Sequence, residues 1–72
     1  MQVIKTFPLD GTKNGDISVS IIENPYGKNS DSIVSIAISL NSKSENPDWK
    51  VHIPKANIDD VVAALVEAKK KL

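Results

Sequence analysis

The sequence predicts a small α+β protein in which a four-stranded antiparallel sheet, connected as a meander, is followed by one C-terminal helix. Of four short runs, the first is rich in β-branched and aromatic residues and the other three alternate apolar and polar residues, and clusters of Gly, Pro, Asn, Asp and Ser separate the runs. Only the last segment has the residue spacing of a helix. The order ββββα over 72 residues fits a single domain, 1–72, whose helix covers one face of the sheet.

The first two expected strands flank a hairpin loop. The run 3–9 is rich in β-branched and aromatic residues, and 10–15 combines two glycines with Asp and Asn, a composition typical of turns. The run 17–21 alternates strictly between apolar residues and Ser, which is the pattern of a half-buried strand.

The third and fourth expected strands follow a longer loop, 24–32, which contains Pro25 and Gly27. The run 33–40 alternates Val, Ile and Leu with Ser and Ala, and 49–53 alternates again after the polar loop 41–47. Pro54 ends the fourth strand because it has no N–H group to donate.

The remaining residues predict a helix with favourable ends. Asn57 is a good N-cap residue, and Asp59 and Asp60 follow in the first turn, where the helix dipole favours anions. Three lysines, at 69–71, occupy the last turn, where cations are favoured.

The apolar arc of this helix spans roughly 160°, which is wider than contact with one sheet requires. A chain of 72 residues without Cys forms a marginal core and has no disulfide to stabilise it. We therefore expect a homodimer with the helix at its centre. The expected dimer-interface residues are Val61, Val62, Leu65, Val66 and Leu72.

Strand alternation assigns the two faces of the sheet. The apolar set, expected on the helix side, is Ile17, Val19, Ile21, Val34, Ile36, Ile38, Leu40, Trp49, Val51 and Ile53. The other set, which we call the open face, is Ser18, Ser20, Ile22, Ser35, Ala37, Ser39, Lys50 and His52. For the first strand, the pattern allows either Lys5 and Phe7 or Ile4 and Thr6 to share the open face.

Composition excludes several classes of protein. Acidic and basic residues number 9 each, so the chain is not polybasic, and every basic residue is Lys. The start of the chain does not have the apolar run of a signal peptide, and no stretch reaches the 18 or so apolar residues of a membrane span. We expect a cytoplasmic protein with no membrane partner.

No metal site, cofactor or catalytic centre is expected. The loop that begins at Asp10 resembles the start of a calcium loop, but its twelfth position, which requires Glu, is Ile21. His52 shares the open face with several Ser residues, yet no orienting acid or nucleophile motif accompanies it. We therefore expect a protein that is not an enzyme.

The chain resembles the positive cofactor four family of transcriptional coactivators and its bacterial, archaeal and phage relatives. The similarity covers about residues 15–72 and is clearest from Val51 through Pro54 and Asn57 into the helix. The resemblance implies four strands and a helix that dimerises, with single-stranded DNA bound across the open sheet faces. The chain has Ser where that family places basic and aromatic residues on its second and third strands.

These observations together predict non-catalytic binding of single-stranded nucleic acid, with DNA as the favoured ligand. The expected processes are transcription or replication, and a DNA-binding role would associate the protein with the nucleoid. Lysines would neutralise phosphates, hydroxyl groups would donate to phosphates or sugars, and aromatic rings would stack on bases. The expected contact residues are Lys5, Phe7, Lys13, Ser18, Ser20, Tyr26, Lys28, Ser35, Ser39, Lys43, Lys50 and His52. The alternative is a small protein–protein interaction module of the same fold that binds no nucleic acid.

Overall fold

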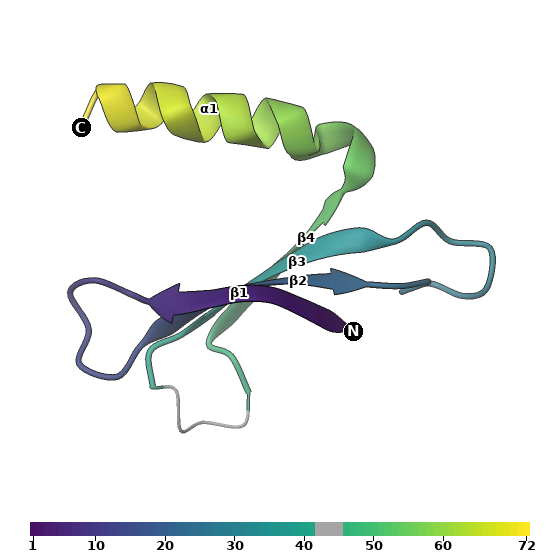
Figure 1. Cartoon of the computed structure of the whole chain (residues 1–72), viewed down its shortest axis with the longest axis horizontal. Coiled ribbons are helices and arrows are strands. Elements are labelled where there is room, and N and C mark those ends of the chain that lie inside the picture. The colour runs from purple at the N-terminus through teal and green to yellow at the C-terminus, as the bar shows by residue number, and fades with distance from the viewer. Residues whose placement is uncertain (42–45) are drawn as a thin grey trace.

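A computed structural model describes residues 1–41 and 46–72. Four strands form one antiparallel sheet in the order β1-β2-β3-β4, and one helix follows them (Figure 1). The elements are β1 Gln2–Pro8, β2 Asp16–Ile22, β3 Ile33–Ser39, β4 Trp49–Pro54, the 3₁₀ turn η1 Lys55–Asn57 and α1 Ile58–Lys70. The predicted α+β meander with a C-terminal helix is confirmed.

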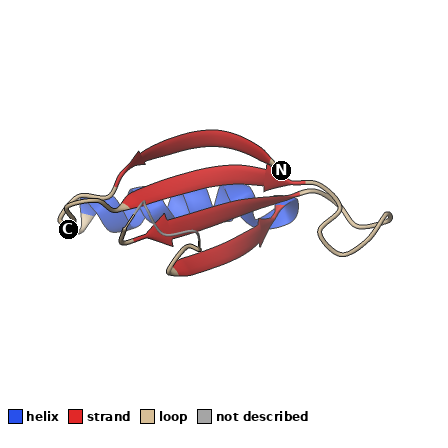
Figure 2. Cartoon of the chain, turned by 90° about the horizontal axis from the view of Figure 1, so that it is seen from below, coloured by secondary structure: helices blue, strands red, loops and turns tan. Residues whose placement is uncertain are grey.

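The pairing register confirms the faces predicted for β2, β3 and β4. Val19 pairs with Ile36, which pairs with Val51, so apolar residues of the three strands share one side of the sheet. Ser20 pairs with Ser35, which pairs with His52, on the other side. Figure 2 shows the sheet in front of the helix, so α1 lies on one side of the sheet, and no described helix covers the open face.

The first strand contains an irregularity that decides between the two alternatives left open for its faces. Val3 pairs with Ser20 and Lys5 pairs with Val19, so one extra residue, Ile4, bulges out of the ladder. Phe7 pairs with Ile17. Of the two alternatives, Thr6 therefore shares the open face with Ser18, and the expectation of Lys5 and Phe7 as open-face contacts is corrected, because their pairing places both on the helix side.

The β1–β2 turn depends on a close approach of two backbone segments at Gly15. The Thr12 hydroxyl donates to the Leu9 carbonyl oxygen at 2.6 Å and accepts from the Gly15 N–H at 3.0 Å. A β-carbon at Gly15 would lie 2.8 Å from the carbonyl oxygen of Ser39 and closer still to the Thr12 hydroxyl oxygen. The absence of a side chain at position 15 thus allows the turn to pack against the end of β3.

Gly15→Ala is accordingly expected to lower the free energy of unfolding by about 1–3 kcal/mol, because the carbonyl of Ser39 is backbone and cannot move aside freely. Chemical denaturation at fixed protein concentration measures the change. Gly11→Asn is the control: Gly11 has open space and φ 84°, a conformation that Asn tolerates. Equal stability of Gly15→Ala and wild type would contradict this account of the turn.

The helix begins at the predicted position, but side-chain capping by Asn57 does not start it. Asn57 occupies the N-cap, but its side chain makes no capping hydrogen bond. The preceding 3₁₀ turn has already brought the backbone into helical geometry, and the Ile58 N–H donates to the Lys55 carbonyl oxygen. Asp59 and Asp60 lie in the first turn of α1, as expected.

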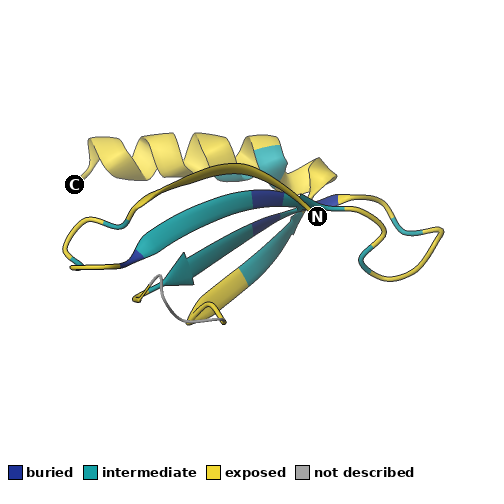
Figure 3. Cartoon of the chain, turned by 60° about the horizontal axis from the view of Figure 1, so that its bottom comes forward, coloured by how far each residue is buried: buried dark blue, intermediate teal, exposed yellow. Residues whose placement is uncertain are grey.

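The apolar layer between α1 and the sheet is incompletely closed in the single chain. Among the described residues, Ile33 is the one buried hydrophobic residue, at 7% exposure, and its pairing with Ile22 gives it the open-face parity of Ser35, so no hydrophobic residue on the helix side of the described strands is buried. No residue of α1 is buried, and Figure 3 shows the helix as almost entirely exposed. Leu65 remains 62% exposed and Trp49 52% exposed, although both belong to the apolar surfaces of this layer. Within the described ranges, no helix is long and apolar enough to cross a bilayer.

Candidate functional site

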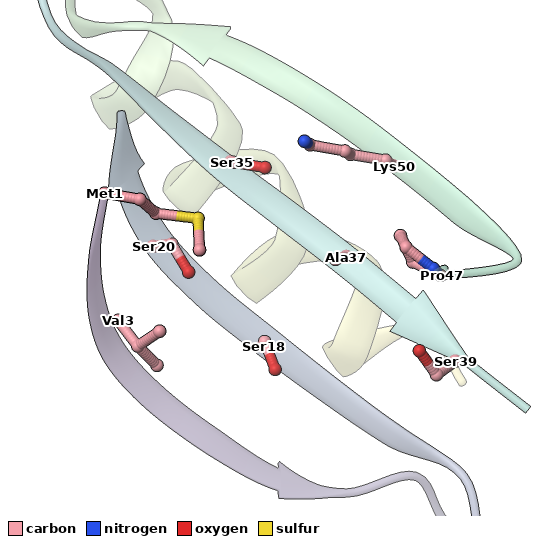
Figure 4. Close-up of a pocket in the computed structure, with 9 residues that line it drawn as sticks. All are labelled: Met1, Val3, Ser18, Ser20, Ser35, Ala37, Ser39, Pro47 and Lys50. Carbon is pink, nitrogen blue, oxygen red and sulfur yellow. The ribbon is translucent and has the colours of Figure 1, made fainter. Parts of the chain in front are cut away.

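The open face is hollowed into a groove of about 250 Å³. We call this the open-face groove, and its lining residues are Met1, Val3, Ser18, Ser20, Ser35, Ala37, Ser39, Pro47 and Lys50 (Figure 4). Small side chains of β2 and β3 form its floor, so a ligand can approach the backbone of the two central strands closely. Four of the predicted contact serines and Lys50 are thereby brought together.

The walls of the groove differ chemically. Met1 and Val3 form an apolar wall beside β2, whereas Lys50 extends over the floor from β4 on the other side (Figure 4). His52 is half-buried on the same strand and face as Lys50. The ammonium group of Lys50 thus lies on one side of the groove, and apolar groups lie along the other.

Two serines at the centre of the floor have unusual surroundings. Ser20 and Ser35 are paired across β2 and β3 and are 6% and 3% exposed. Ser18, in the next row, differs because its hydroxyl is 3.0 Å from that of Thr6. The hydroxyls of Ser20 and Ser35 make no hydrogen bond within the part of the chain that the structure describes.

The β3–β4 connection is held at its base by Asp48. Its carboxylate oxygen Oδ2 accepts from the Leu40 N–H at 2.6 Å, and its own N–H donates to the Ile38 carbonyl oxygen at 2.9 Å. These two bonds fix the chain next to Pro47, which lines one end of the groove. The groove wall is therefore held by hydrogen bonds to the end of β3.

The other predicted contact residues lie elsewhere. Lys5 and Phe7 are on the helix side, and Lys13 is exposed in the β1–β2 loop. Tyr26 and Lys28 are exposed in the β2–β3 loop, at the end of the sheet away from that hairpin (Figure 1). The predicted contact at Lys43 falls outside the described residues.

The loop that carries Tyr26 has a defined conformation. The Tyr26 N–H donates to the Ser30 hydroxyl oxygen at 3.1 Å, and that hydroxyl donates to the Gly27 carbonyl oxygen at 2.8 Å. Asn24, with φ 50°, and Gly27, with φ 120°, both have left-handed backbone conformations that produce the tight bends. The ring of Tyr26 is exposed and does not line the open-face groove.

The open face offers binding groups without an assembled catalytic centre. Ser35 and His52 are neighbours across β3 and β4, but no hydrogen bond joins their side chains in the described structure. No group of three or more His, Cys, Asp or Glu residues that could hold a metal ion occurs in the described ranges. The absence of enzymatic activity remains a prediction.

The expected dimer-interface residues lie along α1 and just beyond it. Val61 and Val62, with Leu65, line an apolar space of about 240 Å³ between the helix and the sheet. The sheet contributes Val19, Val34, Ile36 and Ile53 to this space, and Ile58 completes it. Val66 and Leu72 are exposed beyond it.

Sequence reasoning did not identify Met1, Val3 and Pro47 as groove residues. Val3 faces the open side because of the bulge at Ile4, and short-range alternation contains no signal for that extra residue. Comparisons of the chain with models of known families, with curated proteins and with solved structures gave no match.

Proposed function

We propose that this protein is a non-catalytic homodimer that binds single-stranded nucleic acid, with DNA as the favoured ligand, through its open faces. The open-face groove supports the proposal most directly, because it combines a floor of small hydroxyl side chains with a cationic Lys50 wall. Hydroxyl groups and lysines are typical donors to nucleic-acid phosphates. At about 250 Å³, the groove is smaller than typical pockets for small molecules, and it is open along the sheet.

The surface area of the chain supports the dimer. A folded monomer of 7.8 kDa is expected to expose about 4,400 Å², whereas this chain exposes 5939 Å². The surplus of about 1,500 Å² is within the range that one subunit of an obligate dimer buries. The apolar helix-side layer, which includes Val62, Leu65 and Trp49, is where a second copy would bury this surface.

A fluorescence-anisotropy titration tests the proposed ligand. A labelled oligothymidine of about 20 nucleotides is expected to bind at least about tenfold tighter than a duplex of equal length at low salt, because an unpaired strand can follow a groove that is open along the sheet. Absence of oligothymidine binding at about 50 micromolar protein and about 50 mM salt would reject nucleic-acid binding.

The second candidate function is a protein-interaction module of the same fold. The placement of charged residues favours this candidate, because a nucleic-acid-binding face is expected to gather the basic residues and exclude the acidic ones. Instead, Lys5 lies on the helix side, and Asp16, paired with Ser39, brings an acidic group to the open side. The module hypothesis predicts no binding of oligothymidine, so the same titration separates the two candidates.

A further inference from the structure

Ser20 and Ser35 provide hydrogen-bonding groups that the described protein does not use. Every fully enclosed side-chain oxygen or nitrogen among the described residues has a hydrogen-bond partner. The hydroxyls of Ser20 and Ser35 make no such bond, although the two residues are 94% or more buried. Both hydroxyl oxygens must therefore be open to the groove, and Figure 4 shows them at its floor. A pair of nearly buried hydroxyls without protein partners is suited to a ligand that brings hydrogen-bond acceptors.

The aromatic residues are placed away from these hydroxyls. No aromatic side chain lines the open-face groove among the described residues. Phe7 and Trp49 lie on the helix side by their pairing with Ile17 and Ile38, and Tyr26 is in the β2–β3 loop. Base stacking, which needs an aromatic platform, therefore has no support in the groove.

We infer that the open-face groove binds the sugar–phosphate chain of a single strand and leaves its bases unstacked, with Ser20 and Ser35 donating to backbone oxygens. This inference rests on the proposed function and specifies which part of the nucleic acid is recognised. Lys50 places phosphates on the β4 side, and the apolar wall of Met1 and Val3 accommodates the carbon face of the sugars. Binding is then independent of base identity, because backbone contacts carry no sequence information.

Three oligomers of equal length test the inference by competition against labelled oligothymidine. A fully abasic DNA strand is expected to bind within about twofold of oligothymidine, because base stacking contributes nothing to affinity. If bases of oligothymidine did stack on the protein, the abasic strand would bind at least about fivefold more weakly for each stacking contact that it lacks. An oligothymidine with uncharged methylphosphonate linkages is expected not to compete. If oligothymidine binds and the abasic strand is more than about tenfold weaker, the inference is overturned while the proposed function stands. If no oligomer binds, the proposed function fails and the inference fails with it.

Ser35→Ala tests the role of the hydroxyl without adding bulk. The variant is expected to weaken oligothymidine and abasic DNA equally, by at least about tenfold, because each subunit loses a hydrogen bond to a charged group. Ser32→Ala, which removes an exposed hydroxyl outside the groove, is the matched control and is expected to bind like wild type. Circular dichroism verifies that both variants are folded, and Ser20→Ala provides a second variant at the paired position. Unchanged affinity in folded Ser35→Ala and Ser20→Ala would overturn the inference.

Discussion

Leu65→Asp is expected to dissociate the dimer or unfold the protein at micromolar concentration. In the single chain Leu65 is 62% exposed at the edge of the apolar helix-side space, so the change would destabilise a monomeric protein by no more than about 1–2 kcal/mol. In the proposed dimer the same side chain is covered by the second copy, and an unpaired carboxylate there destabilises the assembly by about 3–5 kcal/mol. Sedimentation velocity combined with circular dichroism measures assembly and folding together.

Ala63→Asp is the matched control for this experiment. Ala63 is exposed on α1, and at 100° per residue it lies outside the apolar arc that contains Leu65. The control adds the same charge to the same helix and is expected to leave the dimer intact. A folded Leu65→Asp variant that sediments like wild type would contradict the proposed interface.

Lys50→Ala is expected to weaken oligothymidine binding and to reduce its salt dependence. Each lysine–phosphate contact contributes about 0.7 to the slope of log affinity against log salt for single strands. A dimer loses two such contacts, so the slope is expected to become shallower by about 1.4 and the affinity at about 50 mM salt to fall roughly 60-fold. Titrations at several salt concentrations measure both quantities.

Lys5→Ala provides the control, because Lys5 is an exposed strand lysine on the other side of the sheet. Its removal changes the net charge by the same amount without removing a groove contact. The slope of Lys5→Ala is expected to equal that of wild type. Equal losses in the two variants would mean that binding depends on overall charge, in contradiction to a site on the open face.

The faces of β2, β3 and β4 could be predicted because their central residues largely alternate and the three strands pair without a bulge. Residues that pair across these strands are therefore of the same polarity, as in the cross-strand row of Ser20, Ser35 and His52. The first strand could not be assigned in this way. The bulge at Ile4 inserts one residue, and the choice between bulged and regular pairing depends on contacts with β2 rather than on local sequence.

For the helix and the groove as well, features set by local sequence could be predicted, and features set by tertiary structure could not. The position of α1 followed from its apolar period, and the wide arc indicated a surface that one sheet does not cover. The missing capping bond at Asn57 arises from the 3₁₀ turn that connects β4 to α1, which periodicity does not reveal. The groove walls at Met1 and Pro47 come from segments far apart in sequence, so strand alternation alone could not place them.

Methyl-region NMR spectroscopy during titration with oligothymidine tests the central claim most directly, because methyl groups report separately on the two faces. The open-face probes are Met1, Val3 and Ala37, and the helix-side probes are Val19, Ile36 and Leu65. Oligothymidine is expected to shift the open-face signals progressively while the helix-side signals keep their positions. Shifts confined to the helix-side probes, or no shifts at all, would contradict nucleic-acid binding by the open face.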